Sequence, residues 1–281
     1  MYKLCRFLKD GKPAVGMYLD DAVGDLSSLG VSSLTDILED PSRLKMSEGL
    51  NLPRTKISST TILPPVERQE IWAAGVTYLR SKKARMEESD FSASAYDRVY
   101  EAPRPEIFFK SLAEKVSGPN GNIGIRADAK WNVPEPELAL VINSKKQLVG
   151  FTAGNDMSSR DIEGENLLYL PQAKMYKHSC AIGPCIVLGA SEEHARSWTI
   201  TIHISREGKD VFNGKTSVDQ IKRSFSELID YLCRSQDFPY GAVFFTGTGI
   251  VPADDFTLQP GDRVRINISG IGSLENTVVV V

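Results

Sequence analysis

Two glutamates lie two residues apart at the start of an apolar run, PEPELALVIN. Side chains two residues apart on a strand point to the same face, so the carboxylates of Glu135 and Glu137 are expected to converge. Asp156 ends a second strand-like run and supplies a third carboxylate. Carboxylates facing one point repel each other unless protons or a cation compensate, and a hard divalent cation such as Mg²⁺ suits them. The residues therefore predict a metal site, unless the two glutamates simply mark a solvated strand end.

Lys174 lies between apolar residues in the segment LPQAKMY. Lysine is rarely buried without a partner, so its ammonium group is expected to face the same carboxylates. His178 follows four residues later and could reach the same site, whereas His194 and His203 fit surface positions. Spacing alone assigns no Ser-His-Asp or Cys-His arrangement. The sequence thus favours chemistry by carboxylates and a lysine.

Strand patterns outnumber helical patterns and do not alternate with long helices, which is typical of an α+β, mainly β fold. A small N-terminal α/β domain is expected over residues 1–63 and a larger domain over residues 64–281, with a Pro-Pro pair between them. The clearest helix is RSFSELIDYLCRS, where Ser224 and Glu227 form a capping box. The glycine-rich segment 117–126 lacks the spacing of a phosphate-binding loop, and we expect it to form a hairpin.

The composition is that of an ordinary globular protein. The chain has 281 residues, 41% of them hydrophobic and 25% charged, and a net charge of −3. Its Lys and Arg residues are scattered, which argues against a nucleic-acid surface. No segment approaches the roughly 18 apolar residues of a membrane span, so no membrane partner and a cytoplasmic location are expected. The four cysteines form no C-x-x-C pair and are expected to be buried thiols.

Several separate motifs, in order over residues 65–281, resemble the fumarylacetoacetate hydrolase superfamily. The segments that carry this resemblance are AAGVTYLRSKKAR, EPELALVI, GFTAGNDMSSRD, QAK, IGPCIVL, FFTGTG and LQPGDRVRINISGIGSLENTVV.

The resemblance implies a mixed β-sheet roll that binds Mg²⁺ or Mn²⁺ through an E-x-E pair and a later aspartate. On that pattern Glu135, Glu137 and Asp156 are the ligands. Lys174 matches the family lysine that reaches the metal and the substrate, and Thr248 matches a threonine that contacts the bound acid group. The implied partners are a small 2-oxo acid and further copies of the chain, as a homodimer or homotetramer.

Members of the family hydrolyse, decarboxylate, isomerise or dehydrate 2-oxo or 1,3-dicarbonyl acids. Family hydrolases use a lid histidine to activate water, but Ser81 stands at that position here, and serine alone is too weak a base. The segments SSRDIEGENLLYLPQAKMY and TGTGIVPADDFTL resemble the 2-keto-3-deoxy-arabinonate dehydratase branch instead. The resemblance therefore implies a Mg²⁺-dependent dehydratase of a 2-keto-3-deoxy sugar acid, acting through an enolate stabilised beside the metal.

Further residues receive roles on this reading. Lys174 is predicted to transfer a proton or stabilise the enolate, and Glu114, in SLAEK, to serve as a second acid or base. Arg80, Ser81 and Arg85, at the entry of a charged segment, are predicted to bind substrate. Glu114 fits a solvated turn equally well, and the two arginines fit a solvent-facing helix.

Two other functions stay open at this point. The first is an acylpyruvate hydrolase, an oxaloacetate decarboxylase or an enol isomerase that uses the same metal site. The second is a catalytically silent homologue that serves as a binding or scaffold protein, against which the intact acidic triad argues.

Overall fold

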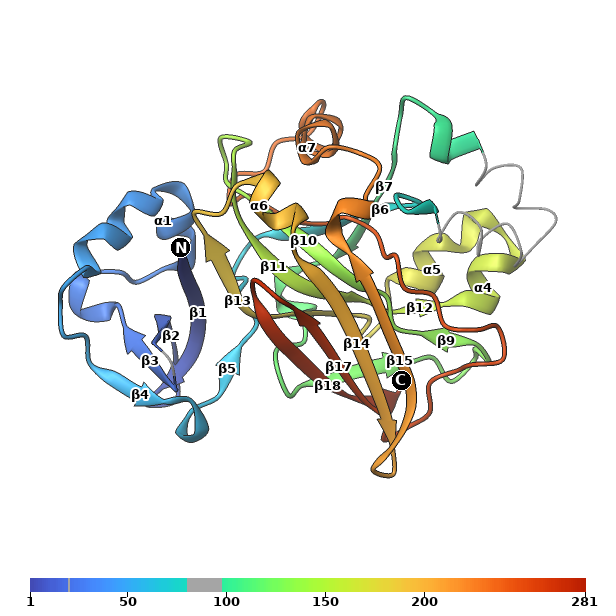
Figure 1. Ribbon diagram of the computed structural model, residues 1–281, viewed down its shortest axis with the longest axis horizontal. Helices are drawn as coiled ribbons and strands as arrows, with labels where there is room; N and C mark the ends of the chain where they lie inside the picture. Colours follow the sequence, from blue (N-terminus) through green and yellow to red (C-terminus); the bar gives the residue numbers. More distant parts are fainter. Residues whose placement is uncertain (20, 80–97) are drawn as a thin grey trace.

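The computed structural model describes residues 1–19, 21–79 and 98–281 (Figure 1). The strands are β1 (Tyr2–Lys9), β2 (Lys12–Leu19), β3 (Ala22–Asp25), β4 (Arg54–Lys56), β5 (Ile62–Leu63), β6 (Glu70–Gly75), β7 (Glu106–Ser111), β8 (Asn122–Ile125), β9 (Asn132–Val133), β10 (Pro136–Ile142), β11 (Leu148–Asp156), β12 (Ser158–Ser159), β13 (Cys180–Leu188), β14 (Thr199–Arg206), β15 (Lys209–Ser217), β16 (Ala242–Phe245), β17 (Arg263–Ile268) and β18 (Gly272–Val280). The α-helices are α1 (Leu34–Glu39), α4 (Arg160–Glu165), α5 (Leu170–Lys174), α6 (Glu192–Arg196) and α7 (Phe225–Cys233).

The described strands form two large sheets and one small one. The larger sheet has 11 strands in the order β4-β3-β2-β1-β13-β11-β10-β16-β6-β7, with β5 paired to β1. A 5-stranded sheet, β15-β14-β17-β18-β8, lies in front of it in Figure 1, and β9 pairs with β12. β16 pairs with β6 and β18 with β8 in parallel, whereas the other named pairings are antiparallel. The predicted mainly β fold with mixed sheets is confirmed.

The N-terminal strands belong to the larger sheet. β1 pairs antiparallel with β13 through three residues, and β2 and β3 extend the sheet beyond it. The domain boundary after residue 63 stays a prediction. The hairpin expected over residues 117–126 is wrong, because Asn122–Ile125 pairs with Thr277–Val280 instead of folding back on its own neighbours.

The central strand β10 is buried on both faces. Leu138, Leu140 and Ile142 pack into the hydrophobic cluster shared with the 5-stranded sheet and α7. Ala139 and Val141 pack into the second cluster, which includes residues of β1, β6 and α1. A strand that is apolar on both faces places the carboxylates at its start deep inside the molecule.

Helix α7 begins where the sequence predicts. The Ser224 side chain accepts a hydrogen bond from the Glu227 N–H at 3.1 Å. The Glu227 carboxylate pairs with the Arg223 guanidinium at 2.5 Å. The described contacts thus include the hydrogen bond of the predicted capping box that the Ser224 side chain accepts. The Glu227 side chain pairs with Arg223.

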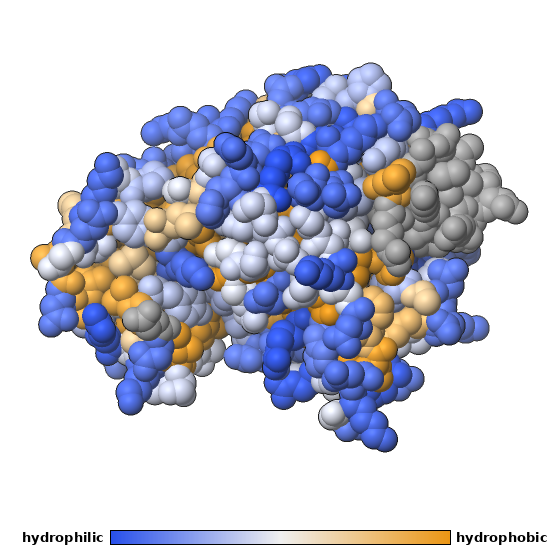
Figure 2. All heavy atoms as spheres, viewed as in Figure 1, coloured by the Kyte–Doolittle hydropathy of each residue, from blue (hydrophilic) through white to orange (hydrophobic). Residues whose placement is uncertain are grey.

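The visible surface is mostly hydrophilic, with smaller hydrophobic areas between the charged side chains (Figure 2). Within the described ranges, none of the helices has the length and apolar character needed to cross a membrane. All four cysteines are free thiols and buried, as predicted.

Candidate active site

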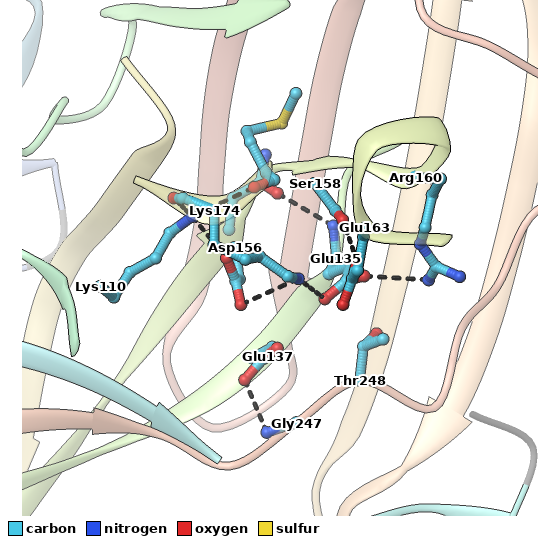
Figure 3. Close-up of polar contacts among 12 residues, drawn as sticks. Lys110, Glu135, Glu137, Asp156, Ser158, Arg160, Glu163, Lys174, Gly247 and Thr248 are labelled. Atoms are coloured by element: carbon cyan, nitrogen blue, oxygen red, sulfur yellow. Dashed lines mark hydrogen bonds and ion pairs between the residues drawn. The ribbon is translucent and has the colours of Figure 1, made fainter. Parts of the chain in front are cut away.

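Glu135, Glu137 and Asp156 converge in the interior (Figure 3). Glu135 directly precedes β10, Glu137 lies on it, and Asp156 ends the adjacent antiparallel strand β11. The Asp156 N–H donates to the Glu135 carbonyl at 2.9 Å, which holds the two strand ends together. One oxygen of each carboxylate lies within 4.8 Å of the others. The three residues are 3%, 1% and 1% exposed, so a solvated strand end does not describe them.

Basic side chains contact two of the three carboxylates. The Lys174 Nζ lies 2.6 Å from Glu135 Oε2 and 3.2 Å from Asp156 Oδ2, so the lysine does face the acidic cluster. Lys174 is the last residue of α5 and is itself buried. On the other side of Glu135, the Arg160 Nη2 donates to Oε1 at 2.9 Å. Arg160 opens α4 directly after β12, and it is among the largest fully buried side chains.

Glu137 is the carboxylate whose charge is least compensated. Its Oε2 accepts a hydrogen bond from the Gly247 N–H at 2.6 Å, and no ion pair to it occurs among the described residues. Burial, followed by repulsion from Asp156 and Glu135, raises the pKa of Glu137 well above its ordinary value of 4.5. The cavity beside it has a volume of about 20 Å³, enough for one ion or water. All-oxygen donors and an uncompensated acid fit a hard divalent cation.

The segment Thr246-Gly247-Thr248 forms the wall opposite Lys174. Gly247 has φ of +90°, and a Cβ at this position would overlap the Thr77 hydroxyl, so only glycine fits here. That hydroxyl donates to the Thr246 carbonyl at 2.6 Å. The Thr248 hydroxyl donates to the Pro136 carbonyl at 3.0 Å and lines the acidic cavity. The structure thus brings the predicted substrate-binding threonine next to the carboxylates.

Glu106 is a further acid that lines this cavity, and the sequence reasoning missed it. It opens β7, and Phe108, two residues later, lines the same cavity. Lys110, two residues further, contacts Asp156. The alternation E-x-F-x-K within a strand was the signal available, because residues i, i+2 and i+4 share one face.

Glu114 lies elsewhere, which corrects its predicted place. It belongs to the short 3₁₀ helix η4 (Ala113–Lys115), and it lines a separate cavity of about 620 Å³ with Lys115 and His178. The reason is local: the chain leaves β7 after Ser111, so Glu114 does not continue the strand face that carries Glu106.

The remaining predicted residues divide into two groups. Arg80, Ser81 and Arg85, which are predicted to bind substrate, lie outside the residues that the structure describes. His194 is exposed, and His203 pairs with Asp210 at the surface, as predicted.

The structure is thus a mixed β fold with a candidate metal centre. This centre is a buried acidic cavity at the ends of two central strands, and a lysine lies inside it. Residues 70–279 match the family model described as fumarylacetoacetate (FAA) hydrolase C-terminal. The chain therefore belongs to the fumarylacetoacetate hydrolase family, as the sequence motifs predicted.

Individual relatives are dehydratases by name. The chain is 42% identical to the probable 2-keto-3-deoxyxylonate dehydratase of Haloferax volcanii over 267 residues, which cover 94% of this chain and 92% of the relative. It is 40% identical to the 2-dehydro-3-deoxy-D-arabinonate dehydratase of Saccharolobus solfataricus over 222 residues, 78% of this chain and 74% of the relative. A solved 2-keto-3-deoxy-D-arabinonate dehydratase complexed with magnesium and 2,5-dioxopentanoate is similar over 99% of both chains, with 34% identity and a TM-score of 0.85.

Proposed function

We propose that this protein is a Mg²⁺-dependent dehydratase of a 2-keto-3-deoxy sugar acid. The observation that carries the proposal is the buried carboxylate triad with the Lys174 Nζ between Glu135 and Asp156, in a chain that matches named dehydratases over most of its length. The resemblance of the magnesium-bound neighbour supports Mg²⁺ as the ion. Mn²⁺ stays a prediction from the family resemblance.

Glu135, Glu137 and Asp156 would hold the cation in this proposal. When bound, a divalent cation supplies Lewis-acid stabilisation of the negative charge that develops on a 2-oxo acid as its C3 proton is removed. The protein contributes three buried carboxylates as oxygen ligands.

Proton transfer in this proposal needs two groups beside the cavity. The Lys174 Nζ contacts Glu135 and Asp156, and Glu106 lines the same cavity. Dehydration removes a proton from C3 and a hydroxyl from C4, so one group must accept a proton and another must donate one to form water. We assign these tasks to Lys174 and Glu106, and we assign Thr248 to the substrate carboxylate.

A substrate panel tests the proposed function. Purified protein would be incubated with 2-keto-3-deoxy-pentonates and hexonates, with Mg²⁺ or with a chelator, and products identified by mass spectrometry. Loss of one water from at least one substrate, dependent on Mg²⁺, is expected. An unchanged panel would refute the proposal, and release of pyruvate or CO₂ from acylpyruvates or oxaloacetate would replace it with hydrolysis or decarboxylation.

Binding of Mg²⁺ is expected to release protons, to an extent that depends on pH. Because the pKa of Glu137 is raised in the metal-free protein, its proton must leave before the carboxylate can hold a cation. Mg²⁺ affinity should therefore fall as the pH drops below that raised pKa. Calorimetric titration in buffers of different ionisation enthalpy measures the protons released, and equal heats in all buffers would contradict the expectation.

The same raised pKa affects stability with a definite sign. At a pH above 4.5, the ordinary pKa of a glutamate, Glu137 loses its proton more readily in the unfolded chain than in the folded one. The free energy of unfolding of the metal-free protein therefore falls as the pH rises towards the raised pKa of the folded state. Mg²⁺ should offset this loss at the upper end of that range, where the carboxylate is ionised.

Gly75→Ala is expected to reduce kcat by at least about tenfold, because general acid-base groups contribute about 10²- to 10⁴-fold. A Cβ at Gly75 would overlap the Glu106 carboxylate and displace it from its place in the cavity wall. Thermal stability should change little, since the displaced group is the end of a flexible side chain. Gly164→Ala on α4, where the added Cβ meets nothing within 4 Å, is the matched control. Full activity of Gly75→Ala would argue against a role for Glu106.

Assembly as a homodimer or homotetramer and a cytoplasmic location stay proposals that rest on the family resemblance and the sequence. Light scattering after size-exclusion chromatography measures the first of them directly.

A further inference from the structure

Lys110 is a buried lysine that the proposed chemistry does not use. It is 1% exposed, and it lies on β7 on the face that also carries Glu106. Its Nζ lies 2.5 Å from Asp156 Oδ1. The same Nζ donates to the Met157 carbonyl at 3.1 Å and to the Lys174 carbonyl at 2.5 Å. Two backbone carbonyls thus take hydrogen bonds from the ammonium group, and its charge pairs with the Asp156 carboxylate.

The contacts of Lys110 join two parts of the acidic site. Asp156 and Met157 belong to the end of β11 and the residue after it, whereas Lys174 ends α5. The carbonyl groups of a last helical turn lack partners within their own helix, so the Lys174 carbonyl needs a donor from elsewhere. Lys110 supplies that donor, and its positive charge stabilises the negative end of the helix dipole.

Lys110 and Lys174 have different positions relative to the cavity. Lys174 lines the acidic cavity and contacts two carboxylates through its side chain. Lys110 is not among the residues that line this cavity, and it reaches Asp156 from the side of β7 (Figure 3). Lys110 lines instead the neighbouring cavity of about 620 Å³, and its contacts with the acidic site run through Asp156 and two backbone carbonyls.

We propose that Lys110 is a positioning residue that fixes the Asp156 carboxylate and the backbone of Lys174 relative to each other. This inference rests on the proposed function, because it assigns Asp156 to the cation and Lys174 to proton transfer. Groups behind the ligands of a metal site typically contribute about 10- to 100-fold to affinity or activity.

Lys110→Met tests the proposal, because methionine keeps the length of the side chain and removes its charge and donors. Lys115→Met, at an exposed position on η4, is the matched control. With Mg²⁺ present, kcat is expected to fall about 10- to 100-fold while KM stays within about threefold. Hydrogen exchange should rise at the amides of Met157 and Met175, which donate to the Ser179 and Pro171 carbonyls, and not elsewhere.

Each outcome has a defined meaning. Unchanged kcat, or unchanged exchange at Met157 and Met175, would overturn the proposal. If exchange rises throughout the chain, the variant is globally destabilised and Lys110→Arg decides, because a guanidinium keeps the charge but not the compact shape of the ammonium. A folded Lys110→Arg protein with full kcat would overturn the proposal, and one with reduced kcat and unchanged KM would support it.

Failure of the proposed function is distinguishable from failure of this inference. A wild-type protein that dehydrates no substrate refutes the function by itself. The exchange measurement with Mg²⁺ alone still reports whether Lys110 holds the ends of β11 and α5 together.

Discussion

Glu137→Gln is expected to abolish measurable Mg²⁺ binding and to reduce dehydratase activity by more than about 100-fold. This loss exceeds the roughly 10- to 100-fold effect of removing a residue that only contacts a metal ligand. The glutamine keeps the volume of the side chain, and its carbonyl oxygen can still accept from the Gly247 N–H, now 2.6 Å from Glu137 Oε2. What disappears is the negative charge. Because the glutamine resembles the protonated acid that burial favours, the metal-free variant should be at least as stable as the wild type.

Calorimetry and thermal unfolding measure both parts of this expectation. The wild type should gain stability with Mg²⁺, whereas Glu137→Gln should gain none. Glu114→Gln is the matched control, since Glu114 lines the other cavity and its charge should not matter to the ion. A Glu137→Gln protein with unchanged Mg²⁺ affinity would show that the triad is not the cation site.

Lys174→Met should have the second large effect, a loss in kcat of about 10²- to 10⁴-fold, the range expected for a group that transfers protons. The substitution removes the ammonium group from between Glu135 and Asp156, which it contacts at 2.6 and 3.2 Å. Removing one partner of a buried ion pair typically costs about 3–5 kcal/mol of stability, so the metal-free variant should unfold at lower temperature. Mg²⁺ should restore part of that stability by compensating the same carboxylates.

Lys177→Met, three residues along the same segment and exposed, serves as the control for Lys174→Met. Steady-state kinetics and thermal unfolding with and without Mg²⁺ are the measurements. Activity of Lys174→Met within a few-fold of the wild type would remove Lys174 from the proposed chemistry.

The acidic triad could be predicted from the sequence because its spacing rule is local. Glu135 and Glu137 are neighbours on one strand face, and the apolar residues that follow them indicate burial on both sides. The position of Asp156 needed the antiparallel pairing of β10 with β11, which the short polar break between the strands makes natural. Helix α7 was predictable for the same reason, since its cap and its apolar stripe lie within one short segment.

Other features depended on contacts between distant segments. Residues 122–125 pair with residues 277–280, which no local pattern indicates, and the expected hairpin was therefore wrong. Glu106 and Lys110 show the same limit, because alternation places them on one face of β7 but does not say what that face meets. Glu114 follows the same strand closely in sequence, but it does not lie on the strand face. Because the chain leaves β7 after Ser111, Glu106 lines the acidic cavity and Glu114 does not.

The pairing of β1 with β13 implies an order of events during synthesis. β1 and β2 can form their hairpin as soon as they leave the ribosome, and β5 can then cover residues 6–7 on the other edge of β1. The partner for residues 2–4 of that edge lies at residues 186–188. Until then this part of the edge stays open, and an open strand edge is a site for association with other chains. The β1 edge is closed by the same strand whose first residue, Cys180, pairs with Asp156. Completion of the N-terminal sheet and assembly of the acidic cavity thus await the same late segment of the chain.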